Sequence, residues 1–297
     1  MSGNAVSAMR DQWAQWLAER RFGGDPATRE RTMVELAARR DKVLELAALA
    51  PGETLLDVGC GEGLIGFGAL DRGAGTVIFS DVSQDLLAVC REAATEFGAL
   101  DRCCFLQMPA DDLAAIGDES VDVVTTRSVL IYVQAKQAAF DEFARVLRPG
   151  GRISLFEPIN RFAIRAGATW AGYDLEPVAE IAEKVRAVYS VIQPETDPML
   201  DFDERDLLHL AEAAGFFPLR LVLEAEISPT EPRSWDGFLN TAGNPNIPTL
   251  AEAMDEALTA TERERLTAYL RPLVERGRGE WRMAIAHLYG TKPCDPH

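Results

Sequence analysis

Apolar positions in the middle of the chain follow two different spacings. Short runs of β-branched and aromatic residues predict buried strands, whereas longer stretches with apolar residues three or four positions apart predict amphipathic helices. Strands that alternate with helices are typical of a parallel sheet covered on both faces. The predicted strands are Glu53–Val58, Thr76–Ser80, Arg102–Gln107, Asp122–Thr126 and Arg152–Phe156, and the predicted helices are Leu64–Arg72, Gln84–Phe97 and Ala135–Leu147.

Helical patterns also flank this region. A helix that contains Trp13 and Trp16 ends near Gly23, and a second one begins at Pro26. Beyond the sheet region the pattern predicts a helix at Pro177–Tyr189, an amphipathic helix at Asp201–Gly215, a sixth strand at Phe216–Leu223, helices at Thr249–Leu258 and Glu262–Glu275, and a strand at Trp281–Tyr289. We therefore predict an α/β protein with a doubly wound sheet.

Charge and composition exclude two classes of partner. The 297 residues carry a formal net charge of -17, whereas binding to a phosphate backbone needs clustered Lys and Arg, so we expect no nucleic-acid partner. The first residues lack the basic and apolar regions of a secretion signal, and no stretch approaches the roughly 18 apolar residues of a membrane span. We expect a cytoplasmic protein without a membrane partner, and a homodimer is left open.

The first predicted strand ends in a glycine-rich turn, Asp57-Val58-Gly59-Cys60-Gly61-Glu62-Gly63. Glycines accept a positive φ and let a ligand lie against the backbone, and the amides of the following helix then face that ligand. The carboxylates of Asp57 and Glu62 would repel the pyrophosphate of a dinucleotide and attract a sulfonium or ammonium group. A nicotinamide dehydrogenase is therefore less favoured, and a turn without a ligand is the other alternative.

An acidic residue follows the second predicted strand. Asp81 lies about twenty residues beyond the glycines, where a carboxylate accepts hydrogen bonds from ribose hydroxyls. Its alternative role is to cap the next helix, although Ser83 is better placed for that.

At these residues the chain resembles the class I S-adenosylmethionine-dependent methyltransferases, whose first motif reads apolar-Asp/Glu-x-Gly-x-Gly-x-Gly. The resemblance covers residues 50–225 and the last strand, and it includes the turn Leu147-Arg148-Pro149-Gly150-Gly151-Arg152-Ile153-Ser154. It implies a mostly parallel seven-stranded sheet with an antiparallel last strand, S-adenosylmethionine as cofactor and S-adenosylhomocysteine as product. The predicted division is an N-terminal helical cap (1–50), a cofactor-binding core (51–227, with an insertion at 160–200), a helical lid insertion (228–280), and a closing strand and tail (281–297).

The resemblance also implies which residues contact the cofactor. The glycine turn and the acid after the second strand would hold the ribose and methionine parts, the segment after the third strand would take the adenine edge, and the segment after the fourth would run beneath the methionine part. The implied residues are Asp57, Gly59, Cys60, Gly61, Gly63, Asp81, Val82, Ala110, Asp111 (with Asp112 as the near alternative), Arg127 and Ser128.

The methyl-transfer zone is implied to lie beside Arg127, Tyr132 and Glu157, our three candidates for a catalytic role. Glu157 follows a strand at the carboxyl edge and is the best candidate for a base, although it could instead bond to the backbone of the insertion. No Asn/Asp-Pro-Pro-aromatic sequence follows the fourth strand, so the family's usual device for methylating base or glutamine amide nitrogens is absent. Methylation of an oxygen, nitrogen or carbon of a small metabolite or peptide remains.

A second class of function stays open, namely a cofactor-binding or scaffold protein of the same fold that transfers no methyl group. The five cysteines lack paired metal-ligand spacing, so we expect no metal. They also do not follow the pattern of arsenic methyltransferases, which place several cysteines around the cofactor.

The two insertions carry aromatic and amide side chains of the kind that line small-molecule sites. We predict that Tyr132 and the insertions line the acceptor site, the alternative being that the aromatics only anchor the lid. The N-terminal helices either close the cofactor cleft or form an ordinary α-hairpin. The candidate acceptor residues of the insertions are Trp170, Tyr173, Trp235, Phe238, Asn240 and Asn244.

Overall fold

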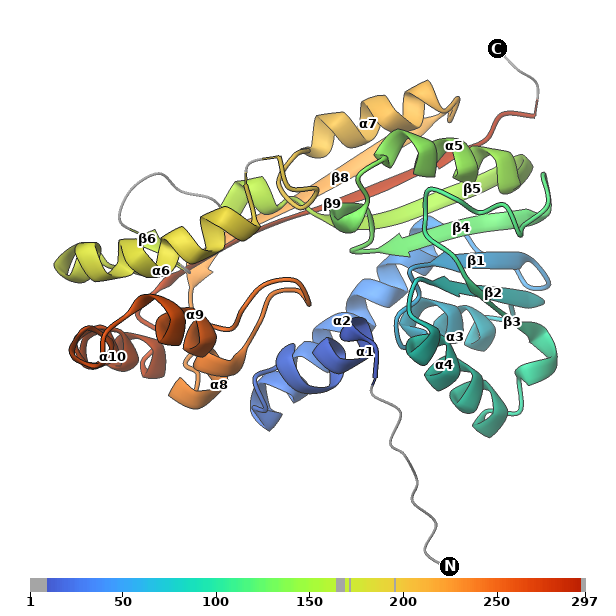
Figure 1. Cartoon of the computed structure of the whole chain (residues 1–297). Helices are drawn as coiled ribbons and strands as arrows, with labels where there is room; N and C mark the ends of the chain where they lie inside the picture. The colour runs from blue at the N-terminus through green and yellow to red at the C-terminus, as the bar shows by residue number, and fades with distance from the viewer. Residues whose placement is uncertain (1–9, 164–168, 171, 195, 295–297) are drawn as a thin grey trace, which may run out of the picture.

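The computed structural model describes residues 10–163, 169–170, 172–194 and 196–294. Its centre is a seven-stranded sheet in the order β3-β2-β1-β4-β5-β9-β8 (Figure 1). Neighbouring strands from β3 to β5 are parallel, and β9 is antiparallel to both of its neighbours, which confirms the predicted fold class. The strands are β1 (Thr54–Val58), β2 (Thr76–Asp81), β3 (Cys103–Gln107), β4 (Val121–Arg127), β5 (Leu147–Pro158), β8 (Leu219–Pro229) and β9 (Glu280–Thr291).

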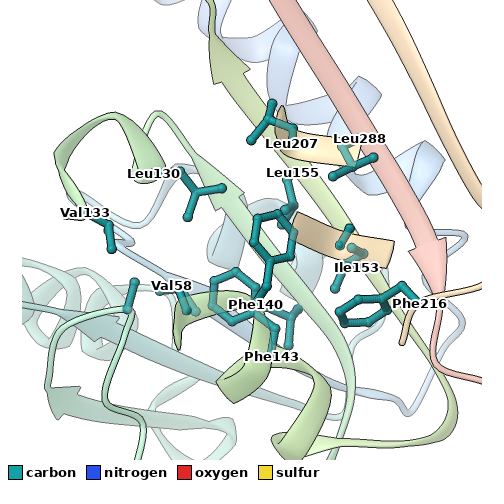
Figure 2. Close-up of a cluster of buried hydrophobic side chains, with 14 of the residues drawn as sticks. Val58, Leu130, Val133, Phe140, Phe143, Ile153, Leu155, Leu207, Phe216 and Leu288 are labelled. Carbon is teal, nitrogen blue, oxygen red and sulfur yellow. The ribbon is translucent and has the colours of Figure 1, made fainter. Parts of the chain in front are cut away.

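Helices cover both faces of the sheet (Figure 1). One face carries α2 (Pro26–Leu46), α3 (Leu64–Asp71) and α4 (Gln84–Glu96), and the other carries α5 (Lys136–Val146) and α7 (Glu204–Ala213). Each face buries its own apolar cluster, because strands in a parallel sheet are apolar on both sides. Figure 2 shows the cluster beneath α5 and α7, where the side chains of Phe140 and Phe143 lie against Val58, Ile153 and Leu155.

Local sequence signals set several of the element ends. The side chain of Ser83 accepts a hydrogen bond from the amide of Leu86 and begins α4, as predicted. Thr249 with Glu252, and Thr259 with Glu262, form reciprocal capping boxes at α9 (Leu250–Ala257) and α10 (Ala260–Glu275).

Strands β8 and β9 form a long hairpin that carries the second insertion at its tip. The predicted sixth strand, Phe216–Leu223, ends too early, because β8 pairs with β9 as far as Pro229 opposite Glu280. At the tip lie α9, α10 and α8 (Trp235–Asn240), and α6 (Ala179–Ile192) from the first insertion packs with them around a third apolar cluster. The sequence did not predict α8 or the short pair β6 (Thr169–Trp170) and β7 (Tyr173–Asp174).

The N-terminal segment consists of a short helix, α1 (Gln12–Gln15), and one turn of π-helix, η1 (Trp16–Arg20). It lies between the sheet domain and the helices of the insertions (Figure 1). In the part of the chain that the structure describes, no helix has both the length and the apolar character needed to cross a membrane.

Candidate functional site

The glycine turn after β1 presents an open backbone surface at one residue. Gly61 has a φ of +56°, and a Cβ built on it would meet no atom within 4 Å among the described residues. Gly59, in contrast, is packed tightly, because a Cβ there would lie 2.4 Å from Cγ2 of Val129. Gly61 is therefore the position of the turn at which a ligand can lie against the backbone.

Asp57 supports this turn from beneath. Its carboxylate accepts hydrogen bonds from the amide of Gly66 (3.0 Å) and from the hydroxyl of Thr125 (3.1 Å), so it ties β1 to the start of α3 and to β4. The side chain is buried, and this burial raises the pKa of the carboxyl group to about 7. Asp57 thus shapes the turn, and its contacts are to protein groups.

Asp81 bridges the turn and the next helix. One carboxylate oxygen accepts from the amide of Gly61 (2.9 Å) and the other from the amide of Ser83 (2.9 Å). Burial raises the pKa of this carboxyl group, although both hydrogen bonds oppose the shift. A carboxylate oxygen has a second lone pair, so each oxygen can still accept a bond from a ribose hydroxyl.

We expect Asp81→Ala to weaken binding of S-adenosylmethionine by about 1.5–3 kcal/mol, because hydrogen bonds between a charged group and a polar ligand are worth about that much. Isothermal titration calorimetry on the folded variant measures the loss. Asp101→Ala removes an exposed acid after α4 and serves as the control. Unchanged affinity in Asp81→Ala would mean that Asp81 is only a turn residue.

The segment after β3, which is implied to contact the adenine, contributes Asp111 to a cavity that the glycine turn does not line. In this segment Ala110 is buried. Val82, which follows β2, is 46% exposed. Asp111 lines a surface cavity of about 490 Å³ whose other walls come from Asp112, Ala114 and α5. Since no residue of the glycine turn lines that cavity, the contact of Asp111 with an adenine edge stays a prediction.

Glu157 holds the loop that follows β4. Its buried carboxylate accepts from the hydroxyl of Thr126 (2.7 Å) and from the amides of Val129 and Leu130 (both 3.1 Å). Burial raises the pKa of this carboxyl group to about 7. The alternative that Glu157 bonds to the backbone of the insertion was wrong, because the amides it accepts from belong to the loop after β4. In that loop Ser128 has a φ of +59°, and its amide donates to the carbonyl of Phe156.

Tyr132 follows the same loop and contacts the N-terminal segment. Its ring meets that of Trp13 edge to face, with 4.9 Å between the centroids. Burial raises the pKa of the phenol to about 12, so the hydroxyl is protonated at neutral pH and can donate a hydrogen bond.

The N-terminal segment connects the cofactor edge of the sheet with the insertions, and its contacts are not those of a self-contained hairpin. The backbone amide of Asp11 donates to the carboxylate of Asp85 (2.6 Å). The side-chain carboxylate of Asp11 accepts from the hydroxyl of Ser83 (2.6 Å). The indole of Trp16 donates to the carbonyl of Ala242 (2.8 Å). Asp11 was missed by sequence reasoning, and its place as N-cap of α1 is the signal that could have drawn attention to it.

The prediction that Tyr173 and Trp235 face an acceptor was wrong. These side chains are only 2% and 6% exposed, and both rings pack on Phe238, with centroids 5.7 and 6.0 Å away. They form the core of the insertion, because helices this short are stable only when their aromatic faces are covered. Asn244 is also buried and donates to the sulfur of Met199. The side chain of Trp170 lies outside the described residues.

The site fits S-adenosylmethionine better than a dinucleotide. Open space over Gly61 adjoins the carboxylate of Asp81, and Asp11 and Asp57 contribute further negative charge to its surroundings. Such a setting favours a ligand with sulfonium and ammonium groups, and it disfavours a pyrophosphate. In the described residues no cluster of metal-ligating side chains occurs.

The sheet order and the site define a Rossmann-like cofactor-binding protein. Residues 56–155 match the family model described as a methyltransferase domain. This stretch carries the glycine turn and Asp81, and it is similar to the class I S-adenosylmethionine-dependent methyltransferases, whose cofactor is S-adenosylmethionine.

Relatives with assigned names match parts of the chain. The arsenite methyltransferase of Halobacterium salinarum is 34% identical over 118 residues, which are 38% of this chain and 29% of that protein. The nocamycin O-methyltransferase of Saccharothrix syringae is 34% identical over 156 residues, 52% of this chain and 51% of the other. The chain thus spans about half or less of the length of these relatives. A structure of geranyl diphosphate methyltransferase in complex with SAM has a TM-score of 0.53 at 17% identity, over 91% of this chain and 92% of that one, and shares the fold.

Proposed function

We propose that this protein transfers the methyl group of S-adenosylmethionine to an oxygen, nitrogen or carbon nucleophile of a small metabolite or peptide. The observation that carries the proposal is the open backbone surface of Gly61, whose amide is bonded to Asp81. When bound, the cofactor supplies an electrophilic methyl group for in-line displacement. The bond from sulfur to methyl breaks as the bond to the nucleophile forms, and a nucleophile that arrives protonated also releases a proton.

The residues of the site have distinct parts in this proposal. Asp81 holds the ribose hydroxyls, and the loop at Arg127 and Ser128 lies beneath the methionine part. Tyr132 donates a hydrogen bond to the acceptor, because its hydroxyl is protonated at neutral pH. Glu157 is a positioning residue, because its oxygens already accept bonds from Thr126, Val129 and Leu130. The protein's main contribution is therefore orientation and exclusion of water.

The N-terminal cap and the second insertion together form the cover of the site in this proposal. Their direct contacts support it, since Trp16 is bonded to the carbonyl of Ala242 and Arg20 forms an ion pair with Glu252 (2.5 Å). The relatives named for arsenite and nocamycin methylation support an acceptor of small size.

We expect S-adenosylmethionine and S-adenosylhomocysteine to stabilise the protein, and NAD and NADP to leave it unchanged. A ligand at about a hundred times its dissociation constant should add about 2.7 kcal/mol to the free energy of unfolding. Thermal denaturation with each ligand measures this. Stabilisation by a nicotinamide dinucleotide alone would contradict the proposal.

Release of S-adenosylhomocysteine over a panel of metabolites and peptides then separates an enzyme from a cofactor-binding scaffold. The scaffold alternative requires cofactor binding without product for any acceptor in the panel. Product formed with one acceptor and absent without it supports methyl transfer.

A further inference from the structure

Three arginines from different elements come together beyond the carboxyl end of β4. Arg127 is the last residue of β4, Arg39 belongs to α2, and Arg21 follows the π-helical turn of the N-terminal segment. Burial, together with the positive charges of Arg21 and Arg39, lowers the pKa of Arg127 to about 10. The three side chains are thus close enough for their charges to repel one another.

This positive charge is only partly neutralised, because one acid, Glu62, acts on Arg21 and the acids near Arg127 have other partners. In the described part of the chain, the guanidinium group of Arg127 has no hydrogen bond or ion pair. The acids whose charges reach it are Asp57 and Glu157, and their oxygens are bonded to other groups. Within the same described residues, the ion pair of Arg39 is with Glu35, at 3.3 Å on the exposed side of α2. An arrangement of this kind is stabilised when an anion joins it.

Arg39 extends this cluster from β4, the neighbour of β1, across β5 and β9. Its guanidinium lies 5.5 Å from the ring centroid of Phe156 on β5 and donates to the sulfur of Met283 on β9. Arg127 is the register partner of the same Phe156. In the sheet order β3-β2-β1-β4-β5-β9-β8, the cluster lies over β4, β5 and β9, whereas the glycine turn and Asp81 follow β1 and β2. The cluster therefore lies on the opposite side of β1 from Asp81, the residue proposed to hold the ribose.

We propose that Arg39 and Arg127, with Arg21 closing from the N-terminal segment, bind a carboxylate or phosphate group of the methyl acceptor. The inference rests on the proposed function, because it concerns the substrate of that same site. Guanidinium groups match such anions with paired hydrogen bonds, and the aromatic ring of Phe156 holds one of them in place. The acceptor is then an acidic small molecule, although the chain as a whole is strongly acidic.

The test uses the full chain saturated with S-adenosylhomocysteine and three probes: benzoate, its neutral analogue benzamide, and inorganic phosphate. Calorimetric titration should show benzoate or phosphate binding at least about tenfold more tightly than benzamide. Arg39→Gln and Arg127→Gln should each reduce that binding about tenfold, since each removes a charge-assisted contact. Arg29→Gln, an exposed position on the same helix, should leave it unchanged.

A second titration distinguishes the acceptor from the cofactor's own carboxylate. Arg39 has no proposed contact with the cofactor, so Arg39→Gln should bind S-adenosylhomocysteine and 5′-methylthioadenosine, which lacks the amino-acid part, as the unmodified protein does. If Arg39→Gln loses affinity for S-adenosylhomocysteine but keeps it for 5′-methylthioadenosine, Arg39 holds the carboxylate of the cofactor and the inference is wrong. Equal binding of benzoate and benzamide, with phosphate unbound, also overturns it while cofactor binding stands. If the unmodified protein does not bind S-adenosylhomocysteine, the proposed function itself fails.

Discussion

Gly61→Asn is expected to lower the affinity for S-adenosylmethionine by about two orders of magnitude, or about 2.7 kcal/mol, in a protein that stays folded. The new side chain would occupy the open space over the turn, where the cofactor is proposed to lie against the backbone. Asparagine is chosen because it tolerates a positive φ better than other side chains, so the backbone need not change.

A matched control separates this steric effect from backbone strain. Gly98 follows α4 and has a φ of +64°, and a Cβ placed on it would likewise meet no atom within 4 Å among the described residues. Gly98→Asn should therefore have the same small effect on stability and none on binding. Calorimetry with cofactor and thermal denaturation without it measure the two quantities. Equal affinities in both variants would place the cofactor elsewhere.

We expect Asp57→Ala to reduce the free energy of unfolding by about 2–5 kcal/mol. The change leaves the buried amide of Gly66 without an acceptor, and the hydroxyl of Thr125 keeps only the longer bond to the carbonyl of Leu56 (3.4 Å); a buried group that loses its partner costs about 1–3 kcal/mol. Asp57→Asn keeps one acceptor oxygen and should cost less. Urea denaturation followed by circular dichroism measures both, and a midpoint for Asp57→Ala equal to that of the unmodified protein would contradict the structural role.

The same carboxyl group makes stability depend on pH. Its pKa of about 7 in the folded protein lies above the ordinary value of 3.8, so the folded state binds the proton more tightly than the unfolded chain. Its contribution to stability therefore decreases as the pH rises from about 4 to 7. Asp57→Asn has no proton to lose there, and its stability should decrease less over this interval. A steeper decrease in the variant would show that the sign of the shift is wrong.

Much of the cofactor side of the site could be predicted from short stretches of sequence. The alternation of apolar runs located the strands, and the glycines marked a turn that needs a positive φ and an exposed backbone. Asp81 was placed correctly at the end of β2 for the same reason, since parallel strands present their carboxyl ends at one edge. These features depend on neighbours in the chain, and the spacing of residues records them directly.

Other features depended on contacts between distant segments. Glu157 was predicted as a base candidate, but the fold brings it to the amide of Val129, 28 positions away in the chain, where it holds a loop. Tyr173 was assigned to the acceptor site, but it is buried against Phe238. The type of side chain is the same in either role, so only its neighbours in space distinguish them.

The sequence by itself determined the sheet, the glycine turn, the cap of α4 and the acid at the end of β2, because hydrophobic period and turn chemistry act over a few residues. The tertiary structure alone decided how the N-terminal segment and the insertion meet, and it brought Arg21, Arg39 and Arg127 together. The bond from Trp16 to Ala242 spans 226 positions. No local spacing encodes such a pairing, since it results from burying whole helical faces against one another.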